Sequence, residues 1–219
     1  MAPLKTWDEV DRYINDTLVQ PDAALEAALE TSARAGLPAI SVSPAHGKFL
    51  WLLARLVNAK RILEIGTLGG YSAIWLARGL APGGRLITLE ALAKHAAVAR
   101  ENIAEARLAH AVEVRVATAL ATLPQLEGPF DLTFIDADKQ NNAEYFRWAL
   151  KLSRPGSVIV VDNVVREGKV VDARSRDSAV QGVRKLNELI AAEPRVAATA
   201  IQTVGAKGYD GFAVALVLA

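Results

Sequence analysis

Five short apolar segments recur along the chain, and each is followed by a turn and a segment with helical periodicity. They are RILEI (61–65), RLITLE (85–90), VEVRVA (112–117), FDLTFID (130–136) and SVIVVD (157–162). Apolar strands that alternate with helices are typical of βαβ units, in which helices cover both faces of a mostly parallel sheet. The alternation therefore predicts an α/β chain with a doubly wound sheet.

The last two apolar segments follow a different rule. VAATAIQTV (196–204) and GFAVALVL (211–218) are separated only by GAKGYD. A parallel crossover needs about a dozen residues or more, so this pair must be antiparallel. We expect seven strands in total, with the last strand reversed.

Mostly helical patterns fill the chain before the first strand. In PDAALEAALETSARAG, Pro21 stands at the expected helix start and Gly36 lies just past its end. SPAHGKFLWLLARLVNA predicts a second helix with Ser43 as its cap. Because no Gly/Ser linker or repeat interrupts the chain, we expect one domain over 1–219, with an N-terminal helical cap (1–58) and a core (59–219).

Composition narrows the class of protein. The chain is 52% hydrophobic and 22% charged, with a net charge of +1, which fits a soluble globular protein and gives no support for a nucleic-acid or membrane partner. The absence of cysteine excludes disulfides, thiolate zinc sites and cysteine nucleophiles. No secretory signal or membrane-length apolar run is found, so we expect a cytoplasmic, reducing location.

Acidic residues end four of the five expected parallel strands. They are Glu64, Glu90, Asp136 and Asp162, and ligands of such sheets bind beyond the carboxyl ends of the strands. Gly66-Thr67-Leu68-Gly69-Gly70 follows the first strand but lacks the second glycine of the dinucleotide fingerprint. A carboxylate at Glu64 suits a cationic or hydroxyl-bearing ligand, and Glu90 stands where an acid can hold ribose hydroxyls. The alternative is an ordinary turn with a surface acid.

Asp136, Asp162 and Asn163 form a second candidate set at the ends of two strands that sequence order places side by side. Two carboxylates and an amide oxygen suit Mg²⁺, Mn²⁺ or Ca²⁺ and leave positions open for substrate oxygens. The alternative is structural: Asp136 and Asp138 would cap the helix near 141–152, and Asp162-Asn163 would form an Asx turn.

LEIGTLGGYS, FDLTFIDADKQNN and VIVVDNVV resemble motifs of the class I S-adenosylmethionine-dependent O-methyltransferases. The closer likeness is to the metal-dependent branch that includes caffeoyl-CoA and catechol O-methyltransferases, and it runs from about Ser41 to the C-terminus. It implies a Rossmann-like seven-stranded sheet with an antiparallel last strand, and a homodimer. The implied reaction is cation-assisted transfer of a methyl group from S-adenosylmethionine to a vicinal dihydroxy-aromatic, a small phenolic substrate.

The resemblance also implies roles for individual residues. Asp136, Asp162 and Asn163 match metal ligands, with Mg²⁺ the expected ion and Mn²⁺ or Ca²⁺ the alternatives. Lys139 matches a proposed general base, so Lys139 and Asp136 are the expected catalytic pair. The residues that match cofactor contacts are Ser43, Glu64, Gly66, Ser72, Glu90, Ala119, Asp136, Asp138 and Tyr145.

Lys139 could act on the phenolic hydroxyl of the substrate in two ways. A phenol titrates near ~10, so it is a poor nucleophile at neutral pH unless a nearby cation favours its ionised form. Lys139 could accept the phenol's proton, or it could steady the phenolate as an ammonium. A solvated lysine at a helix start is the structural alternative.

Two features stand outside the likeness. The stretch VVREGKVVDARSRDS carries Arg166, Glu167 and Lys169 where relatives have apolar residues, which predicts either a plain surface loop or a wall that admits an acidic substituent. His46, His95 and His110 form no ligand spacing, and we expect them to be incidental.

Two other functions remain open at the level of sequence. A nicotinamide-dependent oxidoreductase could use a similar sheet, although the incomplete glycine fingerprint and the terminal hairpin speak against it. A non-catalytic cofactor-binding protein would bind the cofactor without turnover.

Overall fold

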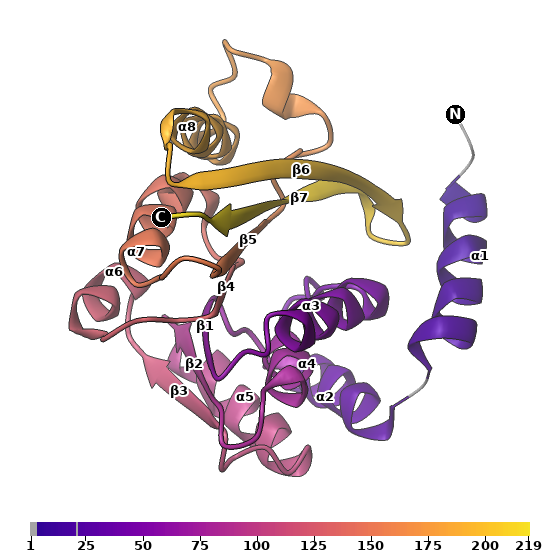
Figure 1. Cartoon of the computed structure of the whole chain (residues 1–219). Coiled ribbons are helices and arrows are strands. Elements are labelled where there is room, and N and C mark those ends of the chain that lie inside the picture. The colour runs from indigo at the N-terminus through magenta and orange to yellow at the C-terminus, as the bar shows by residue number, and fades with distance from the viewer. Residues whose placement is uncertain (1–3, 21) are drawn as a thin grey trace.

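Seven strands form one sheet in the order β3-β2-β1-β4-β5-β7-β6 in the computed structural model, which describes residues 4–20 and 22–219 (Figure 1). The strands are β1 (Arg61–Ile65), β2 (Arg85–Glu90), β3 (Val112–Val116), β4 (Leu132–Ile135), β5 (Val158–Asp162), β6 (Val196–Gly205) and β7 (Gly208–Val217). Strands β1 to β5 pair in parallel, and β7 is antiparallel to both β5 and β6. The predicted doubly wound sheet with a reversed last strand is confirmed.

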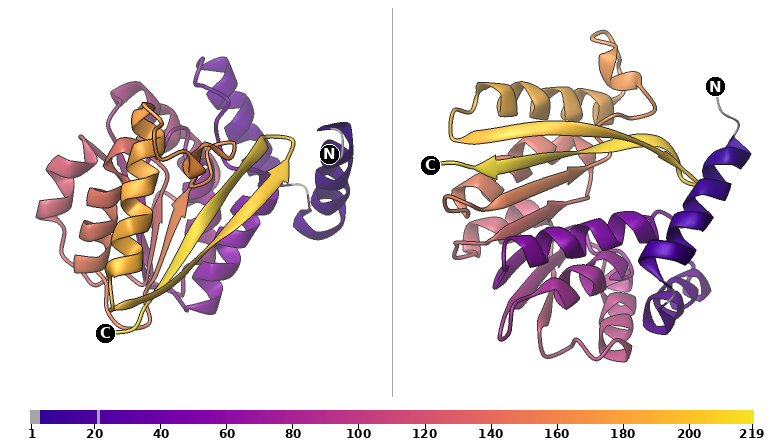
Figure 2. Two further views of the ribbon diagram at one scale, coloured as in Figure 1. Left: turned by 90° about the horizontal axis from the view of Figure 1, so that it is seen from above. Right: turned by 45° about the vertical axis from the view of Figure 1, so that its right-hand side comes forward.

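Helices cover both faces of this sheet (Figure 2). On one face lie α2 (Ala23–Arg34), α3 (Pro44–Leu56), α4 (Tyr71–Gly79) and α5 (Ala93–Glu105). On the other lie α6 (Ala119–Thr122), α7 (Asn142–Lys151) and α8 (Ser178–Ala192). The first helix, α1 (Leu4–Ile14), continues into a π-helical turn (Asn15–Val19) and contacts β6.

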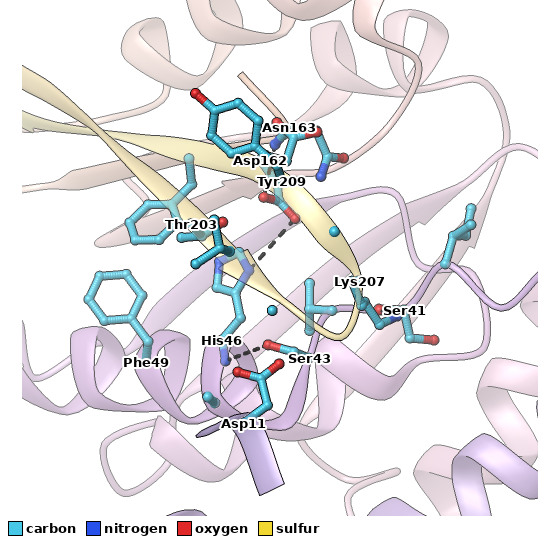
Figure 3. Close-up of a pocket in the computed structure, with 18 of the residues that line it drawn as sticks. Asp11, Ser41, Ser43, His46, Phe49, Asp162, Asn163, Thr203, Lys207 and Tyr209 are labelled. Carbon is cyan, nitrogen blue, oxygen red and sulfur yellow. Dashed lines mark hydrogen bonds and ion pairs between the residues drawn. The ribbon is translucent and has the colours of Figure 1, made fainter. Parts of the chain in front are cut away.

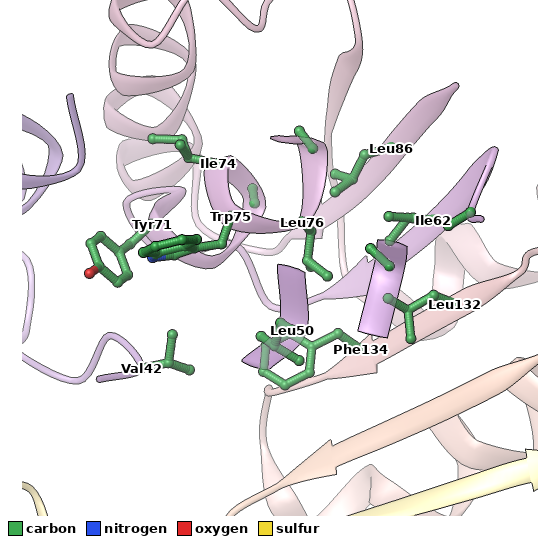
Figure 4. Packing of buried hydrophobic residues seen from close by; sticks show 14 of the residues in the cluster. Val42, Leu50, Ile62, Tyr71, Ile74, Trp75, Leu76, Leu86, Leu132 and Phe134 are labelled. Atoms are coloured by element: carbon green, nitrogen blue, oxygen red, sulfur yellow. The ribbon is translucent and has the colours of Figure 1, made fainter. Parts of the chain in front are cut away.

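The core consists of two layers, one on each side of the sheet. Ile62 and Leu63 are neighbours in β1 and both are fully buried, but Ile62 packs with α3 and α4 (Figure 4), whereas Leu63 packs with the layer of α7 and α8. Successive side chains of a strand point to opposite faces, so a strand covered on both sides must be apolar at nearly every position. This explains why uninterrupted apolar runs marked these strands.

The N-terminal helices begin and end close to the residues expected to cap them. Helix α2 begins after Asp22, whose Oδ1 accepts hydrogen bonds from the amides of Ala24 and Leu25. Pro21, predicted at this helix start, is outside the described part of the chain. Gly36 follows the helix with φ of 68°, and Ser43 caps α3 by accepting from the His46 amide at 3.2 Å.

The terminal hairpin is tighter than its sequence indicates. Strands β6 and β7 run on to Gly205 and from Gly208, which leaves a turn of only Ala206 and Lys207. Tyr209 and Asp210 were expected in the connection but pair with β6 instead, because Gly208 adopts φ of 94° and lets the chain reverse at once. Figure 1 shows this turn reaching toward α1.

In the described residues 4–20 and 22–219, no helix has both the length and the hydrophobicity needed to cross a membrane.

Candidate active site

The neighbouring strands β1 and β4 mark the point where the strand order reverses. The chain leaves β1 for α4 on one face and leaves β4 for α7 on the other, which opens a crevice at the carboxyl ends of the strands. A cavity of about 590 Å³ lies there. It is lined by most of the predicted cofactor residues: Gly66, Ser72, Glu90, Ala119, Asp136, Asp138 and Tyr145. We call it the first cavity.

Gly66 begins the turn after β1, where the backbones of β1 and β4 approach most closely. Its φ is 100°, and a Cβ atom built on it would lie 2.0 Å from the carbonyl oxygen of Asp136. A side chain at this position would have to displace the end of β4. Glycine therefore lets the turn after β1 approach the Asp136 backbone closely.

Glu90 ends β2 with its carboxylate fixed by backbone amides. One oxygen accepts from the amides of Thr67 (3.3 Å) and Leu68 (2.9 Å), and the other accepts from Leu92 (2.9 Å). His95 Nδ1 lies 3.6 Å from Glu90. An acceptor held this firmly at the cavity wall is suited to hydroxyl groups of a ligand.

Glu64 lies behind the wall of the first cavity. It is fully buried, and the hydroxyls of Ser72 and Thr88 each donate to its carboxyl group at 2.6 Å. Burial raises the pKa of Glu64 to about 8 despite these hydrogen bonds, and Asp136 and Glu90 raise it further. Both Glu64 and Ser72 were predicted to contact the cofactor, but only Ser72 lines the first cavity, and Glu64 holds the Ser72 hydroxyl in place from behind.

Asp138 does not cap the helix that follows it. Its carboxylate accepts from the Tyr145 hydroxyl and from the Asn141 side-chain amide, and it makes no capping bond to a backbone amide. Burial and the hydrogen bond to Asp138 raise the pKa of Tyr145. The structural alternative for Asp138 is thus wrong, and its side chain faces the first cavity instead.

A second cavity of about 510 Å³ adjoins the first (Figure 3). Ile40, Ser41, Val42 and Asn163 line both cavities, and Ser43, one of the predicted cofactor residues, lines the second. One wall of the second cavity is aromatic: His46 stacks on Phe212 with ring centroids 5.0 Å apart, and Phe49 lies 5.0 Å from Phe212. This wall suits a flat aromatic ring.

The predicted metal ligands lie where the two cavities meet. Asp136 lines the first cavity, Asp162 lines the second, and Asn163 lines both. Burial and the charge of Asp136 raise the pKa of Asp162, and the charge of Lys139 opposes them. Lys139 Nζ lies 2.7 Å from Asp136 Oδ1.

This donor set fits a hard divalent cation by its chemistry, because it offers two carboxylates and one amide oxygen on adjacent strand ends. The Asx turn expected as an alternative does not form: Asp162 Oδ1 accepts from the adjacent Asn163 amide at 2.8 Å, whereas the amide two residues on, that of Val164, donates to the Gly211 carbonyl oxygen. Asp162 Oδ2 remains, 3.8 Å from His46 Nδ1. No three acidic, histidine or cysteine side chains gather into a metal cluster among the described residues, so the set depends on Asn163.

His46 is a site residue that the sequence did not reveal. We expected it to be incidental, but it lines the second cavity beside Asp162, and burial lowers its pKa to about 4. Only the packing of α3 against β7 brings it there, so no local motif could have marked it. His95 likewise lines the first cavity.

Side chains of the polar loop after Asn163 line different cavities. Arg166 lines the first cavity, with its guanidinium 3.7 Å from Asp210, and Glu167 lines the second. Lys169 pairs with Glu167 at 2.8 Å and lines neither. The acidic-substituent reading of this loop loses support, because the residue that the loop presents to the second cavity is an acid.

A doubly wound sheet with a reversed last strand and a cavity at its switch point is the architecture of α/β proteins that bind ligands beyond the carboxyl ends of their strands. The sequence profile of the O-methyltransferase family matches residues 16–215. The chain belongs to this O-methyltransferase family, which confirms the resemblance found in its motifs.

Individual relatives match along nearly their whole length. The catechol O-methyltransferase of Niastella koreensis is 56% identical over 96% of this chain and 97% of its own length, and that of Mycobacterium tuberculosis is 56% identical over 95% of each. Among solved structures, an O-methyltransferase from Bacillus cereus in complex with SAH is 60% identical with a TM-score of 0.97, covering 98% of this chain and 100% of its own. The O-methyltransferase TomG from Streptomyces achromogenes, in complex with SAM, is 52% identical with a TM-score of 0.97 over 100% of both chains. Family membership rules out the nicotinamide-dependent alternative.

Proposed function

We propose that the chain transfers the methyl group of S-adenosylmethionine to one hydroxyl of a catechol-type acceptor, with a divalent cation at Asp136, Asp162 and Asn163. The observation that carries the proposal is the junction of two cavities at these three residues. One cavity has the polar wall that an adenosyl cofactor needs, and the other has an aromatic wall for a ring. The two catechol O-methyltransferases that are 56% identical to the chain support the choice of acceptor.

The first cavity is proposed for the cofactor. The fixed carboxylate of Glu90 would accept from the ribose hydroxyls, and Ala119 would lie beside the adenine. Ser72, Asp138 and Tyr145 line the part of the wall proposed for the methionine end, where Asp138 offers its carboxylate to an amino group. Glu64 acts through Ser72, and Ser43 belongs to the acceptor side.

The acceptor would lie in the second cavity, with its ring against His46 and Phe212. His46 is neutral at pH 7, because burial lowers its pKa to about 4, so this wall is uncharged and excludes water from one side of the ring. A divalent cation bound at the junction would favour the ionised form of the attacking hydroxyl. Asn163 and Asp162 would fix the hydroxyl end of the ring, which contributes orientation.

Lys139 is proposed to steady the developing phenolate as an ammonium. Its Nζ donates to Asp136 Oδ1 at 2.7 Å, and its side chain is largely buried, so it lies at the junction as a charged donor. It would act as a base only after giving up this ion pair, which makes the donor role the one that the geometry favours.

The test is methyl transfer from radiolabelled S-adenosylmethionine to a panel of catechols, with and without EDTA. We expect labelled product with Mg²⁺, loss of product with EDTA, and recovery when Mg²⁺ is restored. Asp162→Asn should lower the rate by about 100-fold, in the range found when metal sites are disturbed, whereas Glu101→Gln on exposed α5 should not. Product formation that is indifferent to EDTA would remove the cation from the proposal. Cofactor binding without product on any catechol would show a non-catalytic protein.

Two further parts of the proposal concern the state of the chain. We propose a homodimer, supported by the family likeness and by exposed apolar side chains near the N-terminus at Val10, Tyr13 and Leu18. A light-scattering mass of a single chain at micromolar concentration would contradict it. A cytoplasmic location is proposed from the cysteine-free composition, and cell fractionation tests it.

A further inference from the structure

Lys207 lies at the tip of the β6–β7 hairpin and belongs to the wall of the second cavity. Its Nζ donates to the carbonyl oxygen of Ser41, in the segment that lines both cavities (Figure 3). The tip is held from a second side as well, because Asp11 of α1 accepts a hydrogen bond from the Ala206 amide at 2.8 Å. The hairpin tip is therefore held against α1, with the ammonium beside the segment that lines both cavities.

The charges that line the second cavity are unevenly paired. Among the described lining residues Lys207 is the only lysine or arginine, and it forms no salt bridge within the described part of the chain. Most of the lining acids have partners: Glu167 pairs with Lys169 at 2.8 Å, and Asp210 lies 3.7 Å from Arg166 and accepts from three backbone amides. Asp11 accepts from the Ala206 amide and forms no salt bridge within the described residues. Asp162 belongs to the proposed cation site.

The ammonium of Lys207 is also partly desolvated. Burial lowers its pKa, while the more distant charges of Asp136 and Asp162 raise it. If a divalent cation were bound at Asp136 and Asp162, it would neutralise their charges, and these carboxylates would stabilise the Lys207 ammonium less. Lys207 is an exposed residue whose ammonium has one backbone acceptor and no salt bridge in the described part of the chain, so an anion in the adjoining cavity can pair with it.

We propose that Lys207 is a specificity-determining residue that selects acceptors with an anionic substituent, a carboxylate on the ring or on a short side chain. This inference rests on the proposed function and names its substrate class. Figure 3 shows Lys207 and Ser41 on the side of the cavity away from Phe49, so the aromatic wall and the ammonium contact different parts of one acceptor. The hydroxyls face Asn163, the ring faces Phe212, and the substituent faces Lys207.

The experiment compares three catechols that differ only in the ring substituent para to one hydroxyl: carboxylate, methyl and aminomethyl. Values of kcat/KM are measured for the wild-type chain, Lys207→Met, Lys207→Arg and the control Lys185→Met, which removes the charge of an exposed side chain of α8 that lines neither cavity. We expect the wild-type chain to prefer the carboxylate. Lys207→Met should lower the ratio of the carboxylate to the methyl compound by about tenfold, the effect of losing one charge-assisted hydrogen bond at a partly exposed site. Lys207→Arg should keep most of the ratio, and Lys185→Met all of it.

Two kinetic results would overturn the inference: a ratio that Lys207→Met leaves unchanged, or a wild-type preference for the aminomethyl compound. Calorimetric binding of the carboxylate compound in the presence of S-adenosylhomocysteine and Mg²⁺ provides a readout without turnover. Weaker binding to Lys207→Met than to Lys185→Met supports the role of Lys207, and equal binding overturns it. If no catechol is methylated by the wild-type chain, the proposed function fails, and this binding comparison still decides the role of Lys207.

Discussion

Glu64 should give the fold a pH dependence that a single substitution removes. Burial raises the pKa of this carboxyl group from 4.5 to about 8. Below pH 4.5 the group is protonated in the folded and the unfolded chain alike, so it favours neither. Between pH 4.5 and 8 the unfolded chain releases this proton and the folded chain keeps it, so the free energy of unfolding falls as the pH rises through this window.

The size of the effect follows from the shift. At ~1.4 kcal/mol per pKa unit, the free energy of unfolding falls by about 3 kcal/mol between pH 4.5 and pH 7, and by about 5 kcal/mol once the pH exceeds 8. This is a large part of the roughly 5–15 kcal/mol that stabilises a typical domain. The hydrogen bonds from Ser72 and Thr88 are already included in the shift.

Glu64→Gln should remove this dependence without leaving a gap. The glutamine oxygen can accept from Ser72, and its amide can donate to Thr88 Oγ1, which lies 2.5 Å from Thr67 Oγ1 and can donate there in turn. Urea unfolding from about pH 5 to about pH 8.5 measures the effect in the apo chain. We expect the variant to gain about 3 kcal/mol relative to the wild-type chain between the low-pH end and pH 7.

The control for this measurement is Glu101→Gln on exposed α5, which should follow the wild-type curve. Parallel curves for Glu64→Gln and the wild-type chain would refute the reasoning, because they would mean that Glu64 ionises in the folded state as readily as in the unfolded one.

Two further substitutions test the packing around the site and the sheet. Gly66→Ala should lower the free energy of unfolding in urea by more than about 2 kcal/mol, because the added Cβ would lie 2.0 Å from the Asp136 carbonyl oxygen. The control Gly83→Ala is also at positive φ but has open space around it, so it should cost about 1 kcal/mol. Equal costs for the two variants would contradict the steric argument. Asp131→Asn should cost about 2 kcal/mol at pH 7, since the carboxylate accepts from the Lys60 and Arg61 amides and from Arg154. These bonds lower the pKa of Asp131, so the stability is present above its unfolded pKa and is lost as pH falls through the folded one; a cost that persists at pH 2 would contradict this.

The architecture could be predicted because its signals are local. A strand buried on both faces is apolar at nearly every position, and helix caps such as Ser43 act over three residues. The reversal of β7 followed from chain length alone, since six residues cannot cross a sheet. The extent of the hairpin was missed because Tyr209 and Asp210 are common in turns, and only pairing with β6 shows that they continue a strand.

The candidate site, too, was predictable from the sequence in part. The sequence by itself determined which acids end the strands, because parallel strands bring their carboxyl ends to one edge, and so it identified Glu90, Asp136, Asp162 and Asn163 as residues of that edge. It also determined the family, through motifs that recur in order.

Only the tertiary structure decided how these residues divide between two cavities. It placed Glu64 behind the cavity wall, turned Asp138 toward Tyr145, and brought His46 and Lys207 to the wall of the second cavity from distant segments. The reason is physical: side-chain direction, burial and the approach of α3, α1 and the hairpin depend on packing between elements, and no local pattern of residues encodes that packing.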